Sequence, residues 1–327
     1  MAVTSIHGNR YEWIDWMKAF GIYLIVLGHF YSVGEKFVYA FHVPLFYVIS
    51  GFLCKKENDN SLFWKKLWYN LAVPMLIMAT LNFLYYCILK LSYGTFEFIY
   101  VYWFVRDLLV GMESAFDSLW FVYTLILLKI IFQYCSSKRL FYALVVVALV
   151  FAYIYNHLDF TDYPSYLKEP NTFVNVFTAY PFFALGIFLR NYRGGLHEWN
   201  KKVTILLAFL CGLLIVIGCC YFNGFVALFH CDYGGNMFWF LIGGVAGTMM
   251  VFALSKLLGH SPKLVTIISR GTIVILGFHK LFIVSGVMPV PYLDMVYAAL
   301  IVILFIPVII LIEKYFPLMI GKYRTCH

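Results

Sequence analysis

Two ionisable residues, Lys18 and His29, lie eleven positions apart in the first apolar run of the chain. Eleven residues are close to three turns of an α-helix, so both side chains face one side, roughly 16 Å apart along the axis. An imidazole exchanges protons near neutral pH. The spacing predicts a basic group near the cytoplasmic end and a deeper proton-transfer group on one helix face. The alternatives are a Lys18 that reaches the membrane surface beside Asp15 and a His29 that only bonds a neighbouring helix.

Two further histidines are predicted to reach the depth of His29. His42 stands four residues into the second apolar run, and His29 stands four residues before the first run ends. His279 lies near the middle of the ninth run. Ionisable groups are costly inside a bilayer and usually mark functional sites there. The pattern therefore indicates three imidazoles at one cavity, suited to general acid–base chemistry. Hydrogen-bonded packing groups are the alternative for His42 and His279.

The elements that must hold these groups are membrane helices. Of the 327 residues, 63% are hydrophobic and 12% are charged, with a mean hydropathy of +0.84. Soluble domains contain about 45–50% apolar and about 25% charged residues. This composition excludes a soluble domain, a disordered chain and a secreted disulfide scaffold. The eight cysteines show no CxxC motif and no mixed Cys/His ligand spacing, so no metal site is predicted.

Ten apolar runs can be marked as membrane-spanning helices. Most of the 24 lysines and arginines lie on segments that face the cytoplasm if the N-terminus does. The predicted fold is an all-α integral membrane protein, a single domain over residues 1–327 with a bundle of about ten transmembrane helices and both termini cytoplasmic. The net charge of +8 follows from this topology and needs no nucleic acid. The runs are roughly 15–33, 38–54, 65–90, 118–135, 140–156, 173–190, 203–222, 236–258, 264–286 and 292–316.

The segment 91–117 is predicted to be an extracytoplasmic interfacial piece, because it is too short and too charged to span. It is rich in aromatic residues, including Trp103, and carries the adjacent pair Arg106 and Asp107. These side chains are candidates for contact with a sugar. An aromatic belt at the lipid surface is the alternative for the aromatic residues.

Four stretches follow one another in a recognisable order. They are Ile14–His29, in which a lysine precedes a histidine by eleven; Phe41–Leu53, which contains Ser50-Gly51; Leu119–Val122, which contains Trp120; and Ser269–His279. In these tracts the chain resembles the membrane-bound acyltransferase family 3, especially its fucose 4-O-acetylase-like branch. With the ten runs, the resemblance covers essentially the whole chain. In one departure, Asn70 stands where arginine is common in the family, and the lysines of that run come earlier.

The resemblance implies an O-acyltransferase that moves an acyl group, usually acetyl from cytoplasmic acetyl-CoA, to a hydroxyl of a cell-surface glycan or lipid-linked sugar. Lys18, Lys65 and Lys66 would hold the phosphates of the donor. Ordinary cytoplasmic charge also accounts for Lys65 and Lys66. The resemblance further implies a bacterial inner membrane, with membrane lipid around the chain. The association of several copies is left open.

We interpret His29 as the general base that takes a proton from the sugar hydroxyl. A donor for the oxyanion would come from Ser50, His42 or Trp120, and His279 completes the catalytic set. A covalent acyl group on His29 or Ser50 is the mechanistic variant. The competing interpretation is a transporter or exporter of polysaccharide or lipid-linked intermediates without acyl chemistry. A weaker one is a sensor or scaffold without catalysis.

Overall fold

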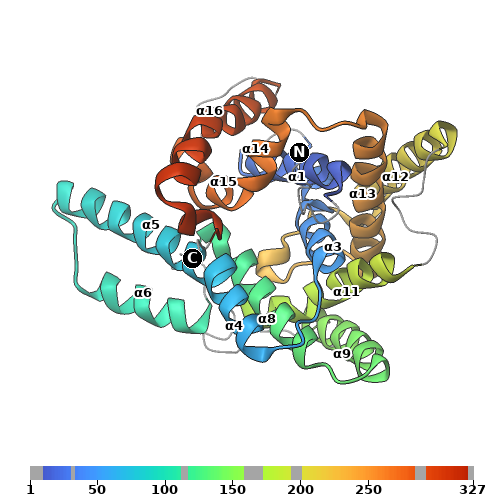
Figure 1. The fold of residues 1–327 in the computed structure, drawn as a ribbon, viewed down its shortest axis with the longest axis horizontal. Coiled ribbons are helices and arrows are strands. Elements are labelled where there is room, and N and C mark those ends of the chain that lie inside the picture. Colours follow the sequence, from blue (N-terminus) through green and yellow to red (C-terminus); the bar gives the residue numbers. More distant parts are fainter. Residues whose placement is uncertain are drawn as a thin grey trace, which may run out of the picture.

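The chain folds almost entirely into helices, as a computed structural model shows (Figure 1). The structure describes residues 10–30, 34–111, 117–157, 172–192, 201–283 and 292–322. The α-helices in these ranges are α1 Glu12–Gly28, α2 Glu35–Tyr39, α3 His42–Leu53, α4 Asn60–Leu67, α5 Val73–Ser92, α6 Ile99–Val110, α8 Trp120–Tyr134, α9 Lys138–His157, α11 Thr172–Asn191, α12 Lys202–Asn223, α13 Met237–Leu258, α14 Lys263–Arg270, α15 Thr272–Phe278 and α16 Leu293–Tyr315.

Several of these helices have the length and composition of membrane spans. Among the described residues, seven helices qualify, or eight if the bent pair of α14 and α15 is one span. Each of the ten predicted runs coincides with a helix or a helix pair. However, α1 has 17 residues and α8 has 15, fewer than the about 20 that a span normally needs. A multi-pass helical architecture is thus confirmed, whereas ten spans and the side of the termini stay predictions.

Helix α3 is deeply buried, with ten of its twelve residues inside the protein. It crosses α11 at very close range: a Cβ added to Gly51 would overlap the carbonyl oxygen of Phe183, and one added to Gly186 would overlap that of Val48. Small residues at a crossing in lipid let two helix backbones approach. The Ser50-Gly51 motif therefore has a packing role, because it seats α3 against α11.

Two irregular turns interrupt the regular helices: a π-helical turn within the continuous stretch Asn60–Ser92 and a bend beside Gly271. A π-helical turn over Trp68–Ala72 precedes α5, because Pro74 has no N–H to offer the carbonyl of Asn70. The second break lies between α14 and α15, which together with the following 3₁₀ turn bend by 60°. A side chain on Gly271 at this break would overlap Ile309 of α16, so glycine lets the bend pack. Broken helices are tolerated inside membranes where they are buried in protein or line a cavity.

The two ends of the bundle differ in chemistry. At one end α1 begins and α3 and α13 finish. The ring of Trp13 shows that these helix ends lie together, because it packs edge-on against both Phe52 and Phe252. The ends of α11 and α8 join them through hydrogen bonds to the carbonyls of Cys54 and Cys135. We call this the basic end; it holds Arg10, Lys56, Lys138 and Arg190. At the other, the histidine end, α1 finishes at His29 and α3 begins at His42.

Candidate active site

A cavity of about 160 Å³ lies at the histidine end, and we call it the histidine cavity. Its walls come from α1, α2, α3, the turn before α8 and the start of α8, the end of α15 with the turn that follows it, and the loop that joins α12 to α13. The polar and aromatic side chains that line it include His29, His42, Ser118, Trp120, His230 and Lys280. The structure thus gathers side chains from four parts of the sequence, within residues 25–46, 118–121, 225–230 and 276–280.

Two of the three histidines are anchored by their own helices. The Nδ1 of His42 bonds the carbonyl of Val38 at 2.8 Å, and the Nδ1 of His279 bonds the carbonyls of Ile275 and Leu276 at 2.9 and 3.0 Å. A carbonyl oxygen only accepts, so Nδ1 carries the proton in both rings. In the neutral form Nε2 is then an acceptor, and neither ring has a second N–H to donate.

His29 is held differently. It is the residue that follows α1, and its ring lies 4.9 Å from the ring of His279, centroid to centroid. Among the described residues its imidazole makes no hydrogen bond. His42 and Lys280 line the same cavity as His29. This ring therefore faces the cavity with its proton-exchange capacity uncommitted, which is the property that a general base needs.

Ser118 is a cavity residue that the sequence interpretation missed. Its side chain is buried, and its Oγ has no hydrogen-bond partner within the part of the chain that the structure describes. Trp120, two residues later, is 8% exposed and packs against Phe229 with ring centroids 5.2 Å apart. A buried unpaired hydroxyl costs free energy unless something uses it. Its place at the start of α8 could not be separated from ordinary capping in the sequence.

The loop over the histidine cavity is firmly attached. Asn223 donates to the carbonyl of Tyr233 at 2.8 Å, and the hydroxyls of Tyr233 and Thr178 share a hydrogen bond. The thiol of Cys231 lies 3.6 Å from the side-chain oxygen of Asn175, and burial raises its pKa to about 12, so it remains a neutral donor. These contacts fix the segment that carries Phe229 and His230 to α11 and α12.

Ser50 does not reach this cavity. It lies eight residues, about two turns or about 12 Å, along α3 from His42. It is not among the residues that line the histidine cavity. Within the described ranges, no group of three or more His, Cys, Asp and Glu side chains is placed to hold a metal ion.

Lys129 and Arg190 come from different helices and meet at Cys54 inside the basic end; together with Lys18 of α1 we call them the cation cluster. Lys129 of α8 lies 3.9 Å from the Sγ of Cys54, and Arg190 of α11 donates to the carbonyl of Cys54. The charge of Lys18 on α1 interacts with the charges of both Asp15 and Lys129. Like charges are brought together only where an anion or other groups compensate them. Lys129 and Arg190 were missed as site residues, although a lysine inside an apolar run is itself a signal of function.

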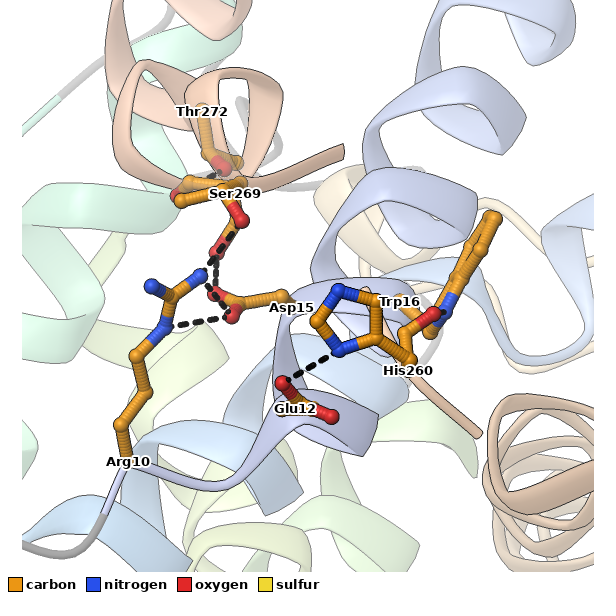
Figure 2. Close-up of polar contacts among 8 residues, drawn as sticks. Arg10, Glu12, Asp15, Trp16, His260, Ser269 and Thr272 are labelled. Atoms are coloured by element: carbon orange, nitrogen blue, oxygen red, sulfur yellow. Dashed lines mark hydrogen bonds and ion pairs between the residues drawn. The ribbon is translucent and has the colours of Figure 1, made fainter. Parts of the chain in front are cut away.

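Asp15 makes its hydrogen bonds with Arg10 and Ser269, while its charge also acts on Lys18. Arg10 donates to its Oδ2 from Nε and Nη2 at 2.9 and 2.6 Å, and the hydroxyl of Ser269 donates to its Oδ1 at 2.6 Å. Figure 2 shows this arrangement beside a second contact, in which Glu12 meets His260 at 2.9 Å. The contacts of Asp15 with Arg10 and Ser269 join the start of α1 to α14. It gives Ser269, part of the family-like motif, a structural role.

Replacing Ser269 with alanine is expected to lower the free energy of unfolding by about 1.5–3 kcal/mol, because a buried bond to a carboxylate is lost. Urea titration of the purified protein in detergent measures the change. Ser61→Ala on exposed α4 is the matched control, since the Ser61 hydroxyl makes no hydrogen bond within the described chain. Equal stability of the two variants would contradict this role for Ser269.

The remaining predicted site residues do not line the histidine cavity. Lys66 pairs with Glu57 at 2.7 Å, and both Lys65 and Lys66 are exposed on α4. Helices α5 and α6 project together from the bundle (Figure 1), and Phe104 of α6 stacks on α5. On α6, Trp103 is 44% exposed, and Arg106 binds the fully buried Asp107 at 2.6 Å. Residues 112–116 of the predicted interfacial segment lie outside the described residues.

The apolar helices and the polar groups gathered inside their bundle define a multi-pass membrane protein with an internal site. A family model described as an acyltransferase domain matches residues 11–314, nearly the whole chain. The chain belongs to the acyltransferase family 3, as the resemblance of its motifs indicates. Family membership supports an acyltransferase activity. Comparisons with curated proteins and with solved structures find no match.

Proposed function

We propose that the protein is a membrane O-acetyltransferase that moves acetyl from acetyl-CoA to a hydroxyl of a cell-surface glycan or lipid-linked sugar. The observation that carries this proposal is His29. Its imidazole lines a cavity, has no hydrogen bond within the described chain and follows directly on the helix that presents Lys18. Acetyl-CoA is the donor by analogy with the family, and its cytoplasmic origin agrees with the predicted orientation of the basic end.

The chemistry assigned to the cavity is a single acyl transfer. His29 takes the proton of the acceptor hydroxyl while the oxygen attacks the thioester carbonyl. The C–S bond then breaks, the acetyl ester forms, and the proton passes to the departing CoA sulfur. Ser118 and Trp120 supply the hydroxyl and the indole N–H for the oxyanion. Neutral His42 is a poorer hydrogen-bond donor for the oxyanion, because its only N–H already bonds the carbonyl of Val38.

The donor enters from the basic end in this proposal. Lys18 and His29 lie on one face of α1, roughly 16 Å apart, a distance that an extended pantetheine arm covers. The cation cluster would bind the anionic end of the donor there, and the thioester would reach toward His29. Lys18 suits this task because it lies on the face of α1 that leads to His29, and because the hydrogen bonds of its neighbour Asp15 go to Arg10 and Ser269.

The test uses purified protein in detergent, radiolabelled acetyl-CoA and candidate glycans. Label that becomes stably attached to a glycan hydroxyl supports the proposal. Transfer to none of a broad set of polysaccharides and lipid-linked sugars would contradict it. Vesicle uptake of the same glycans without label would favour the transporter interpretation instead.

Lys18→Ala is expected to raise the KM for acetyl-CoA about tenfold, because a charge-assisted contact to phosphate is worth about 1.5 kcal/mol or more. Lys18→Arg should keep much of the affinity, since the charge remains. Lys263→Ala, at an exposed position where α14 begins, controls for loss of overall positive charge. Steady-state kinetics with varied acetyl-CoA make the comparison. An unchanged KM in Lys18→Ala would remove this residue from the donor site.

A further inference from the structure

A second and larger cavity, of about 640 Å³, opens at the basic end. It lies between the end of α8, the start of α9 and the end of α11, with Lys56 from the segment after α3 at its side. Small-molecule sites usually have volumes of about 300–1,000 Å³. Neither the predicted donor lysines of α4 nor the histidine cavity belongs to it, and we call it the basic-end pocket.

Two lysines give this pocket a positive charge. The Nζ of Lys56 donates to the carbonyl of Cys135 and lies 5.4 Å above the ring of Phe132. Lys138, the first residue of α9, lines the same pocket. No carboxylate is among the lining residues that the structure describes. Ser136 and Ser137, which directly precede Lys138 in the sequence, add hydroxyl groups to the lining. This set of side chains suits a phosphorylated ligand.

The opposite walls of the pocket are aromatic. Phe141 is buried beneath it, whereas Tyr142, Phe188 and Tyr192 are about half exposed at its rim. Flat rings beside lysines suit a ligand that carries both a planar heterocycle and phosphates, because a base stacks on such faces. A simple phosphate or sulfate would leave these rings unused.

The pocket adjoins the cation cluster. Ile187 and Asn191 of α11 line the pocket, and Arg190 between them reaches the carbonyl of Cys54. Cys54 also contacts Lys129, whose charge in turn interacts with that of Lys18. A chain of positive groups therefore runs from the pocket to α1, the helix that ends at His29.

We propose that the basic-end pocket binds the 3′-phosphoadenosine diphosphate portion of the acyl donor, with Lys56 and Lys138 on its phosphates and the aromatic rim on its adenine. This inference rests on the proposed function. It assigns the nucleotide to the junction of α8, α9 and α11. In this proposal Lys65 and Lys66 do not bind the donor phosphates, since Lys66 is already paired with Glu57 at the surface.

The direct test measures binding of adenosine 3′,5′-bisphosphate to the purified full-length protein by calorimetry. Lys56→Ala and Lys138→Ala are each expected to weaken binding about tenfold, because each removes a charge-assisted contact. Lys55→Ala and Arg139→Ala are matched controls: both side chains are exposed neighbours that do not line the pocket. Binding that is equally strong in all four variants would overturn the proposal.

An anionic lipid headgroup shares the phosphate chemistry and needs its own arm. The same variants are purified in nanodiscs with and without phosphatidylglycerol, and bound lipid is measured by mass spectrometry. We expect the nucleotide to bind in both preparations. Absence of nucleotide binding, together with lysine-dependent retention of phosphatidylglycerol, would assign the pocket to lipid and contradict the proposal.

A third arm separates this inference from the proposed function. Acetyl-CoA is compared with S-acetylpantetheine, a donor that lacks the nucleotide. The preference of the wild type for acetyl-CoA in kcat/KM should fall about tenfold in Lys56→Ala, while transfer from S-acetylpantetheine stays unchanged. An undiminished preference would refute the pocket assignment. If the wild type transfers acetyl from neither donor, the proposed function fails, and nucleotide binding alone then decides the pocket.

Discussion

Replacing His29 with alanine is expected to lower acetyl transfer by a factor of about 10²–10⁴, the usual contribution of a positioned general base. The loss should appear in kcat, because the imidazole acts on the proton that moves in the transition state. The KM for acetyl-CoA should change little, since Lys18 and the cation cluster lie at the other end of α1. Initial rates with labelled acetyl-CoA and the accepted glycan measure both parameters.

The control for this variant is His157→Ala. His157 is exposed at the end of α9 and bonds the carbonyl of Tyr153 in its own helix, outside the histidine cavity. Its loss should leave transfer near the wild-type rate. Both variants should elute as the wild type does in size-exclusion chromatography. Full activity of a correctly folded His29→Ala protein would end the general-base assignment.

The same protein separates direct transfer from a covalent intermediate. Wild-type enzyme mixed with labelled acetyl-CoA and no acceptor should carry no stable label if His29 acts as a base. Stoichiometric label on His29 or Ser50, located by peptide mass spectrometry, would favour the covalent variant instead. Ser50 lies about two turns along α3 from His42, which makes it the weaker candidate for that intermediate.

Gly51→Ala is expected to destabilise the protein by about 3 kcal/mol or more, at or above the upper end of ordinary overpacking. The added methyl group would overlap the carbonyl of Phe183, which is backbone and cannot rotate away as a side chain does. Helices α3 and α11 would have to separate, so His42 at the start of α3 would also move. Chemical denaturation in detergent measures the loss.

Gly218→Ala provides the control for this effect. Gly218 lies inside α12, and a Cβ there would meet nothing within 4 Å. Because alanine is a better helix former than glycine, this variant should gain about 0.5–1 kcal/mol. Similar destabilisation by the two substitutions would show that the α3–α11 contact is not the cause.

Features that depend on local chain properties could be predicted from the sequence. Each of the ten runs coincides with a helix or a helix pair, because a backbone in lipid must satisfy its own hydrogen bonds. The three histidines could be brought together by counting residues from the helix ends, and His29 and His42 line one cavity. The family could be recognised from four short motifs, and the matched residues 11–314 confirm it.

The partners of individual polar side chains could not be predicted from the sequence. Lys129 and Arg190 could be counted as charges, but their meeting at Cys54 depends on how α8 and α11 pack on α3. Asp15 was considered a partner for Lys18, and its charge does act on Lys18, but its hydrogen bonds go to Arg10 and to Ser269, the latter 254 residues away. Ser50 drew attention through its motif, although the close approach at that place belongs to Gly51.

The amino-acid sequence by itself determined that this protein is a helical membrane protein of a recognisable family with imidazoles in its interior. Hydropathy and helical period are properties of neighbouring residues, so they can be read along one chain. Only the tertiary structure decided which polar groups share a cavity and which neutralise one another. Those contacts depend on the rotation, bend and crossing of packed helices. The 60° bend beside Gly271 and the α3–α11 crossing at Gly51 are examples.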